Sequence, residues 1–188
     1  MVSTLQESVQ SFRGRRMTYK GAPLMSVKQD WGTPQSFFDY VEEQFKIKFS
    51  LDACASAHNY KVEYYFSEED NALEQTWYGT TWLNPPFGKG GKLQRQFIQK
   101  ASNEAWLGNC YVYALIPART DTRLFHDIIM KEASAVYFIK GRLNFEHDDR
   151  TPRGSATFPN MLVVFNGIRY PNGPHMGTLE PTKKERGF

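Results

Sequence analysis

The stretch from Thr80 to Gly91, TTWLNPPFGKGG, constrains the fold more than any other part of this sequence. Thr81, Trp82 and Leu83 have side chains that favour a β-strand, whereas the two prolines that follow Asn84 lack the N–H groups of a central strand. The sequence therefore predicts a buried strand that ends at Asn84. Each proline fixes its own φ and restricts the residue before it, so a stiff, extended loop should follow.

This loop presents hydrogen-bond acceptors beside an aromatic ring. Asn84 has a side-chain amide oxygen, Pro85 has a backbone carbonyl, and Phe87 has a flat apolar face. Two acceptors that hold the hydrogens of an aromatic amino group would favour a pyramidal nitrogen with a free lone pair, while the ring holds the base in line. Alternatively, Asn84-Pro85-Pro86-Phe87 is only a rigid turn, and these four residues alone do not decide between the two interpretations.

The composition is that of one globular domain. The chain has 188 residues, 40% of them hydrophobic, with 14 Phe, 10 Tyr and 4 Trp, which is enough for a sizeable core. A net charge of +3 permits a nucleic-acid partner without requiring one. No apolar run is long enough to span a bilayer, and the first residues lack the apolar centre of a secretion signal, so we expect a cytosolic protein. Cys54 and Cys110 are expected to be reduced core residues.

The first 30 residues are predicted to form a flexible basic arm. There is no acidic residue between Ser8 and Gln29, where Arg13, Arg15 and Arg16 lead a series of basic side chains. Such an arm is suited to contacts with phosphates. The alternative is a tail that only improves solubility.

Residues 31–166 are predicted to form one α/β domain. Its first helix follows Trp31, with Thr33 as N-cap, Pro34 as first helical residue and an end near Phe45. No helix separates the apolar runs at 135–139 and 156–165, so they should pair as antiparallel strands. Residues 167–188 hold three prolines and are expected to be a loose tail. The other predicted elements are strands at 47–51, 62–66 and 110–116, a helix from Leu93 to about Gly108, and a helix over 124–129 capped by Thr120 or Asp121.

Small and acidic residues follow the strand that is predicted to end at Asp52. Ala53 and Cys54 would let a ligand approach the backbone, and an aspartate at the carboxyl end of a strand can hold the ribose or amino group of a cofactor. Asp52 could instead only cap the following helix. Asp70 is equally open, because it either caps a short helix or faces the same crevice.

Two polar loops are further candidates. Residues 88–92, GKGGK, are typical of a mobile lid or a phosphate contact, although a plain linker is also rich in glycine. The run Glu146-His147-Asp148-Asp149 could suggest a metal site, but it stands between Arg142 and Arg150, which favours a solvated loop over 146–155. We therefore predict no metal.

The order of these segments resembles the phage-type Dam family of DNA adenine-N-6 methyltransferases. The shared pattern is W-x-T-P, LDACAS, D-x-A-L, NPPF, LIPA-R-T, GRLNF and TFPNMLVVF, and it covers Trp31 to Phe165. The resemblance implies a Rossmann-like class I methyltransferase fold that uses S-adenosylmethionine. Such a fold is α/β, with a mostly parallel sheet, a C-terminal antiparallel hairpin and helices on both faces.

The resemblance also implies roles for particular residues. The catalytic motif would be Asn84, Pro85, Pro86 and Phe87. The cofactor would be held by Asn84 and by three further sets of residues: Asp52, Ala53 and Cys54 in the first motif, Asp70 near the cofactor adenine, and Trp31, Thr33 and Pro34 at the methionine end.

This sequence departs from the wider class of amino-methyltransferases in three ways. The first motif lacks the usual glycines. Only 17 residues separate Asp52 from Asp70, so Glu63 or Glu68 could bind the cofactor ribose instead. A separate target-recognition domain is also not obvious in the sequence. DNA contacts would come from the basic arm, the polar loops or a second subunit, and the candidates are Arg13, Arg15, Arg16, Lys89, Lys92, Arg119, Arg142, Arg150 and Arg153.

We therefore expect an enzyme that flips an adenine out of double-stranded DNA and moves a methyl group directly onto its 6-amino nitrogen. The alternatives are a methyltransferase for RNA adenine or protein glutamine, an inactive DNA-binding decoy and, less well supported, a nuclease built on Asp148 and Asp149. The resemblance suggests protection of phage DNA from restriction in the host cytoplasm, with GATC or relaxed specificity. A homodimer is compatible with the sequence.

Overall fold

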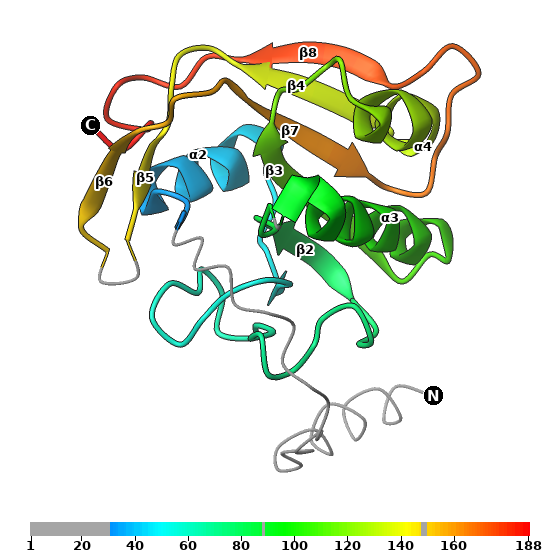
Figure 1. The fold of residues 1–188 in the computed structure, drawn as a ribbon, viewed down its shortest axis with the longest axis horizontal. Coiled ribbons are helices and arrows are strands. Elements are labelled where there is room, and N and C mark those ends of the chain that lie inside the picture. Colours follow the sequence, from blue (N-terminus) through cyan, green and yellow to red (C-terminus); the bar gives the residue numbers. More distant parts are fainter. Residues whose placement is uncertain (1–30, 88, 148–149) are drawn as a thin grey trace.

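The computed structural model describes residues 31–87, 89–147 and 150–188. Its centre is a six-stranded sheet with the order β1-β2-β3-β7-β4-β8 (Figure 1). The predicted basic arm with Arg13, Arg15 and Arg16 lies outside the described residues, as do Asp148 and Asp149. The six strands are β1 (Leu51–Asp52), β2 (Gly79–Leu83), β3 (Cys110–Pro117), β4 (Ala135–Ile139), β7 (Asn160–Phe165) and β8 (His175–Leu179).

Among the described residues, the remaining elements are one hairpin and three helical regions. Strands β5 (Asn144–Glu146) and β6 (Pro152–Ser155) pair with each other in a separate two-stranded sheet. The helices are α2 (Gln35–Phe45), α3 (Lys92–Trp106) after the 3-10 turn η1 (Lys89–Gly91), and α4 (Met130–Glu132) after the π-helical turn η2 (Phe125–Ile129). Across the described part of the chain, no helix is long and apolar enough to cross a bilayer.

The sheet is mixed, with more parallel than antiparallel pairs. Strands β1, β2 and β3 run parallel, β7 is antiparallel to both β3 and β4, and β8 is parallel to β4. The predicted antiparallel pairing of 135–139 with 156–165 is therefore confirmed. Because β1, β2 and β3 are parallel, they end together at Asp52, Leu83 and Pro117. We call this the carboxyl edge of the sheet, and the opposite one the amino edge.

Helices cover both faces of the sheet (Figure 1). Strand β3 shows why, because its residues alternate between two hydrophobic cores: Val112, Ala114 and Ile116 pack on the side of α3, while Leu115 packs on the side of α2. The α3 side also includes Ile98 and Ala101 of α3 and Ile128 and Ile129 of η2, and the α2 side includes Phe37, Phe38 and Val41 of α2.

Helix α2 begins one residue later than predicted. Pro34 is its N-cap, and the Pro34 carbonyl accepts hydrogen bonds from the Phe37 and Phe38 amides at 3.0 and 3.1 Å. The Thr33 hydroxyl caps nothing. The cap of the helical segment that contains η2 is also shifted, from Thr120 or Asp121 to Thr122, whose hydroxyl accepts from the Phe125 amide at 3.3 Å.

Two predicted strands are much shorter than expected. The segment 47–51 contributes only Leu51 to β1, because the Ile47 and Phe49 amides bond to the Glu42 carbonyl and carboxylate instead of to a neighbouring strand. In 62–66 a single bridge joins Tyr65 to Asp52. Residues 68–74 form turns and no helix, so Asp70 is not a helix cap.

Two predictions about loops were wrong. The expected loose tail contains β8, whose backbone pairs with β4 over Ala135–Ile139. The expected solvated loop over 146–155 begins and ends in strands, since Glu146 closes β5 and residues 152–155 form β6. Strand β8 finds its partner about 40 residues away, whereas β5 and β6 pair with each other as a hairpin, and a local composition of charges and prolines reveals neither pairing.

Candidate active site

Asn84 follows β2 at the carboxyl edge, between the ends of β1 and β3. Its side-chain amide nitrogen donates a hydrogen bond of 2.6 Å to the backbone carbonyl of Trp31. Asn84 is half-buried, and Pro85 is buried. This hydrogen bond commits the amide nitrogen as the donor and fixes the amide plane, so the oxygen Oδ1 is the group that can accept from a ligand.

A row of four aromatic rings connects this loop to segments far away in the sequence. The Phe87 ring lies 5.6 Å from that of Phe158 at an interplanar angle of 86°. Phe158 lies 5.8 Å from Trp31, and Trp31 lies 5.4 Å from Phe145. We call Phe87, Phe158, Trp31 and Phe145 the aromatic row. Edge and tilted ring contacts of this kind favour fixed ring orientations.

Phe145 and Phe158 were not identified as site residues from the sequence. The signal was present, since both stand in segments, GRLNF and TFPN, that carried the family resemblance. What sequence cannot provide is their distance to Phe87 and Trp31.

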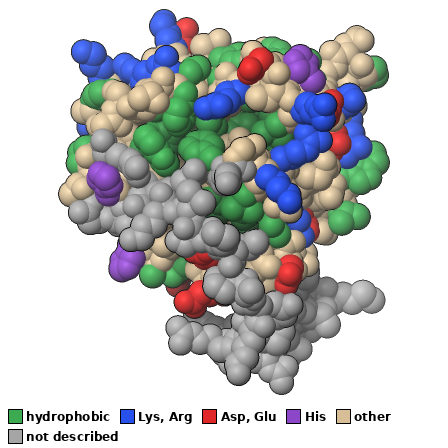
Figure 2. Space-filling view, viewed as in Figure 1, with side chains coloured by type: hydrophobic (Ala, Val, Ile, Leu, Met, Phe, Trp, Pro, Cys, Tyr) green, Lys and Arg blue, Asp and Glu red, His purple; other side chains and the backbone are tan. Residues whose placement is uncertain are grey.

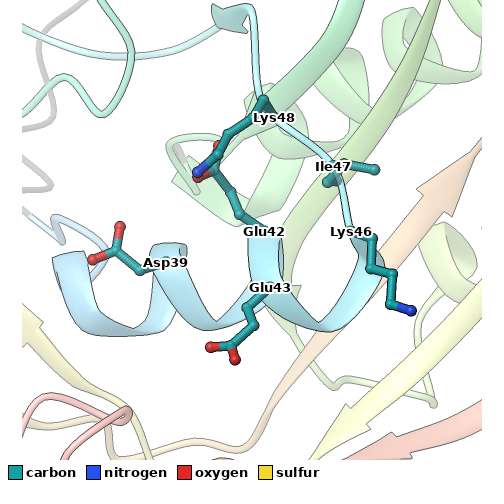
Figure 3. A pocket seen from close by; sticks show the side chains of 6 residues that line it. All are labelled: Asp39, Glu42, Glu43, Lys46, Ile47 and Lys48. Carbon is teal, nitrogen blue, oxygen red and sulfur yellow. The ribbon is translucent and has the colours of Figure 1, made fainter.

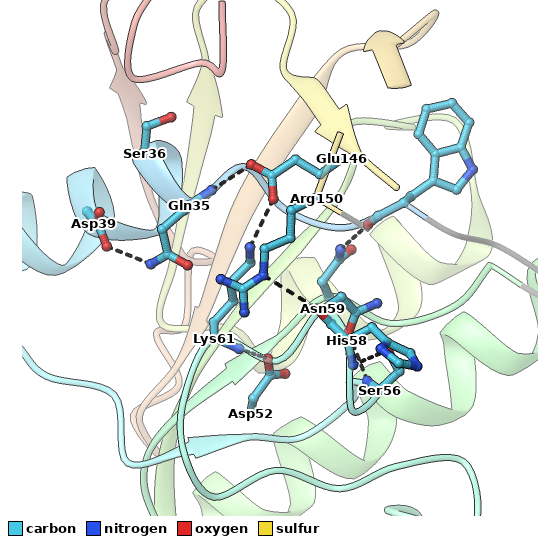
Figure 4. Close-up of polar contacts among 12 residues, drawn as sticks. Gln35, Ser36, Asp39, Asp52, Ser56, His58, Asn59, Lys61, Glu146 and Arg150 are labelled. Atoms are coloured by element: carbon cyan, nitrogen blue, oxygen red, sulfur yellow. Dashed lines mark hydrogen bonds and ion pairs between the residues drawn. The ribbon is translucent and has the colours of Figure 1, made fainter. Parts of the chain in front are cut away.

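Asp52 closes β1 and is 2% exposed. Its two carboxylate oxygens accept hydrogen bonds from the backbone of the loop that follows. One bond comes from the Cys54 amide at 3.3 Å, and the other comes from the Lys61 amide at 3.1 Å (Figure 4). Burial raises the pKa of Asp52 to about 7, although these hydrogen bonds and the Lys61 charge act in the opposite direction. Asp52 therefore fastens residues 54–61 to the carboxyl edge.

Two buried polar atoms at this edge have no hydrogen-bond partner among the described residues. One is the hydroxyl of Thr33, which is 2% exposed, and the other is Oδ1 of Asn160, also 2% exposed. Asn160 begins β7 and pairs with Pro117, the last residue of β3. An unpaired buried polar group costs about 1–3 kcal/mol, which a polar ligand would offset. Asn160 was missed in the sequence because it appeared only as part of TFPN.

Asp70 is exposed and lies in a turn. Its carboxylate accepts hydrogen bonds from the Ser67 amide and hydroxyl, at 2.8 and 2.7 Å. Ala53 is buried and donates its amide to the Trp82 carbonyl at 2.9 Å. Cys54 is half-buried, and burial raises the pKa of its thiol, so it stays protonated.

The predicted DNA-contacting residues that the structure describes lie in two places. Lys92 begins α3 and Arg119 follows β3, so both lie near the carboxyl edge. Both side chains are exposed. Arg142 and Arg150 are exposed beside the β5–β6 hairpin, and the Arg150 guanidinium donates to the His58 carbonyl at 3.4 Å. Lys89 is in η1 and Arg153 in β6. On the face seen in Figure 2, Lys and Arg side chains lie around an area of hydrophobic side chains.

A surface hollow lies elsewhere, around the C-terminal half of α2 (Figure 3). Charged side chains line most of it, including Glu42 and Lys48, which form an ion pair. Lys48 precedes β1, so the hollow is near the amino edge and shares no residue with the site around Asn84.

The chain is similar over most of its length to known proteins of one family. The sequence model of a family described as DNA N-6-adenine-methyltransferase (Dam) matches residues 21–186. A DNA N-6-adenine-methyltransferase of Haemophilus phage HP1 (strain HP1c1) is 32% identical over 182 residues, which cover 92% of this chain and 99% of the relative. A DNA N-6-adenine-methyltransferase of Escherichia phage T1 is 30% identical over 128 residues, covering 66% of this chain and 50% of the relative.

Proposed function

This chain belongs to the Dam family of DNA N-6-adenine-methyltransferases, and we propose that its active site is the carboxyl edge around Asn84. The protein is an adenine-specific DNA methyltransferase with S-adenosylmethionine as methyl donor. The observation that carries the assignment of the site is the hydrogen bond from the Asn84 amide nitrogen to the Trp31 carbonyl, because it leaves the amide oxygen as the acceptor.

In this proposal Asn84 and Pro85 grip the amino group of the target adenine. The Asn84 amide oxygen and the Pro85 carbonyl accept its two hydrogens, Pro86 keeps the loop stiff, and Phe87 stacks on the ring. The nitrogen lone pair would attack the methyl carbon directly while the carbon–sulfur bond breaks, so that S-adenosylhomocysteine leaves and the amino group releases one proton to solvent. The base must first leave the duplex at a cost of a few kcal/mol, of which one aromatic stack returns about 1–3 kcal/mol.

S-adenosylmethionine supplies a methyl group activated on a sulfonium. Asp52, Ala53 and Cys54 at the end of β1 would hold the nucleoside part, and Trp31, Thr33 and Pro34 the methionine end. The unpaired buried hydroxyl of Thr33 fits a polar ligand there. The ribose or adenine contact falls to Asp70, Glu63 or Glu68. A Rossmann-like fold is supported by parallel strands that end beside these residues, with β7 antiparallel between β3 and β4.

Double-stranded DNA is the proposed form of the substrate, in the cytoplasm of a host cell. The basic residues Lys89, Lys92, Arg119, Arg142, Arg150 and Arg153, together with Arg13, Arg15 and Arg16, would contact phosphates. A second copy of the chain could add contacts as a homodimer.

Replacing Asn84 by alanine tests the site. Asn84→Ala should abolish transfer of labelled methyl groups to DNA, while calorimetry still detects S-adenosylmethionine binding, because the amide oxygen acts on the base. Asn109→Ala is the matched control, since Asn109 also donates its side-chain amide, to Glu104 at 2.8 Å, but lies before β3 at the amino edge. Near-normal turnover in Asn84→Ala would defeat the assignment. Duplex and single-stranded substrates of one sequence would identify the preferred form of DNA.

A further inference from the structure

Glu146, the last residue of β5, holds the segment that positions Asn84. Its backbone forms an isolated antiparallel bridge with Gly32, in which the Gly32 amide donates to the Glu146 carbonyl at 2.9 Å and the Glu146 amide donates to the Gly32 carbonyl at 2.8 Å. Gly32 directly follows Trp31, whose carbonyl accepts the Asn84 hydrogen bond. The hairpin therefore fixes the position of the acceptor that orients Asn84.

The Glu146 side chain makes two further contacts (Figure 4). Its oxygen Oε1 accepts a hydrogen bond of 3.2 Å from the backbone amide of Gln35, the first residue of α2. A carboxylate at this position satisfies a free N–H group and interacts favourably with the helix dipole. Its oxygen Oε2 pairs with the Lys61 ammonium at 3.2 Å, and the Lys61 side chain is only 3% exposed.

Lys61 continues this connection to Asp52. Its backbone amide donates to the Asp52 carboxylate at 3.1 Å, at the end of β1. A series of contacts thus runs from Asn84 through Trp31, Gly32, Glu146 and Lys61 to Asp52. It joins three segments that sequence separates widely: 31–35, 52–61 and the β5–β6 hairpin.

We propose that Glu146 is a positioning residue that holds the base-binding and cofactor-binding sides of the active site in one geometry. This inference rests on the proposed function, which assigns those sides to Asn84 and Asp52. The carboxylate need not touch either substrate. Its role is to keep the Trp31 carbonyl and the 54–61 loop in fixed places, since small displacements of aligned reacting groups reduce rates strongly.

Stability alone is a weak reason for this arrangement. A buried ion pair often contributes little compared with well-packed apolar side chains, because both charges lose their hydration. Glu146 also differs from an ordinary ion-pair residue in bonding to the first residue of α2 and, through its backbone, to Gly32. These extra contacts point to orientation.

The variant Glu146→Gln tests the proposal, with Glu104→Gln as matched control. Glu104 is buried, where Glu146 is half-buried, and like Glu146 it pairs with a lysine (Lys100) and accepts a backbone amide, that of Trp77 at 3.4 Å. It lies on α3 and has no contact with the segments joined by Glu146 that the described residues record. Both variants should lose stability, but only Glu146→Gln should disturb the site.

Hydrogen exchange of the cofactor-free protein gives a readout that does not depend on catalysis. In Glu146→Gln, amides in both 31–35 and 58–62 should exchange about 10-fold faster than in the wild type, whereas Glu104→Gln leaves both unchanged. With cofactor and DNA, Glu146→Gln should bind S-adenosylmethionine about 10-fold more weakly and also lower kcat about 10-fold. Unchanged exchange in either segment, or unchanged binding and kcat, would overturn the proposal.

A double variant separates an effect on stability from an effect on the geometry of the site. Lys61→Met with Glu146→Gln removes both charges, so it should regain thermal stability while the fast exchange and the weak cofactor binding remain. Full recovery of binding and kcat together with stability would show that Glu146 serves only the fold, and would overturn the proposal. The two proposals can fail separately. If the amides of both segments are protected in the wild-type protein but S-adenosylmethionine does not bind, the proposed active site is refuted. The role of Glu146 in joining these segments would then still stand.

Discussion

At the scale of single residues, Asp52 is a buried carboxyl group in contact with charged and polar neighbours. The Lys61 ammonium is near it, the Cys54 and Lys61 amides bond to it, and the buried Cys54 thiol adjoins it. Burial outweighs these partners and raises the pKa of Asp52 from 3.8 to about 7. The folded protein therefore keeps a proton that the unfolded chain has released above about pH 4.

This pKa predicts how stability depends on pH. Because the folded state binds the proton more tightly, raising the pH from about 4 to 7 should lower the free energy of unfolding, by at most about 4 kcal/mol from this group. Asp52→Asn has no proton to lose. Guanidinium unfolding measures the free energy of unfolding of both proteins at pH 5 and pH 7. Between these pH values the wild type should lose stability relative to Asp52→Asn.

The control for this prediction is Asp127→Asn. Asp127 is also an aspartate near a basic residue, Arg95 at 3.8 Å, but its side chain is 46% exposed. The stability difference between wild type and Asp127→Asn, measured at the same two pH values, is the baseline for the Asp52→Asn difference. If the Asp52→Asn difference stays constant or shifts in favour of the wild type, Asp52 is ionised in the folded protein.

Residue chemistry at the end of β2 could be predicted from sequence, but the partners of these residues could not. The two prolines after Asn84 predict that the strand ends at Asn84, and β2 ends at Leu83, one residue earlier. The Asn84 partner Trp31 is 53 residues away, and the Glu146 partner Lys61 is 85 residues away. Glu146 looked like part of a solvated charged run because local composition carries no information about a buried lysine on another segment.

At the scale of elements, the aromatic row connects the loop after β2 to the segment before β7. Phe158 contacts both Phe87 and Trp31, so it supports the ring proposed to stack on the base. Phe158→Leu keeps apolar volume but removes the edge contacts, and kcat should fall about 10-fold while S-adenosylmethionine affinity stays within about twofold. Single-turnover methylation and calorimetry measure the two effects.

Phe49→Leu controls for the loss of an aromatic ring from the same side of the sheet. Phe49 packs against Phe38, Trp82 and Tyr113 in the core on the α2 side of the sheet, and none of these rings belongs to the aromatic row. This change should lower stability and leave kcat unchanged. Equal effects of Phe158→Leu and Phe49→Leu on kcat would mean that the aromatic row acts only through stability.

Long periodic elements were easier to predict than elements that depend on distant pairing. Helices α2 and α3 and strand β3 have clear apolar periods, and their predicted ranges agree with the structure to within one or two residues. Strand β8 has no such period and is flanked by prolines. It forms because β4 presents its free edge to it. Farther along the same tail, the Arg186 carbonyl accepts a hydrogen bond from the distant Asn144 amide at 2.8 Å.

At the scale of the whole molecule, the sheet order separates two ends with different roles. Asn84 and Asp52 lie at the carboxyl edge with Lys92 and Arg119, whereas Lys48 precedes β1 and Arg169 follows β7 at the amino edge. Arg169 is held over the Trp106 ring at 4.3 Å and pairs with Glu132. If DNA binds at the carboxyl edge, Lys92 and Arg119 should contribute more to DNA affinity than Lys48 and Arg169.

The salt dependence of DNA binding measures this difference. Each lost phosphate contact should reduce the slope of log affinity against log salt by about 0.9, so the double variant Lys92→Ala with Arg119→Ala should reduce it by about 2. Lys48→Ala with Arg169→Ala removes the same charge from the amino edge and should leave the slope nearly unchanged, because long-range attraction alone is screened beyond about 10 Å at 0.1 M salt. Equal reductions in the two double variants would indicate that net charge, and not a phosphate-binding surface beside Asn84, attracts the DNA.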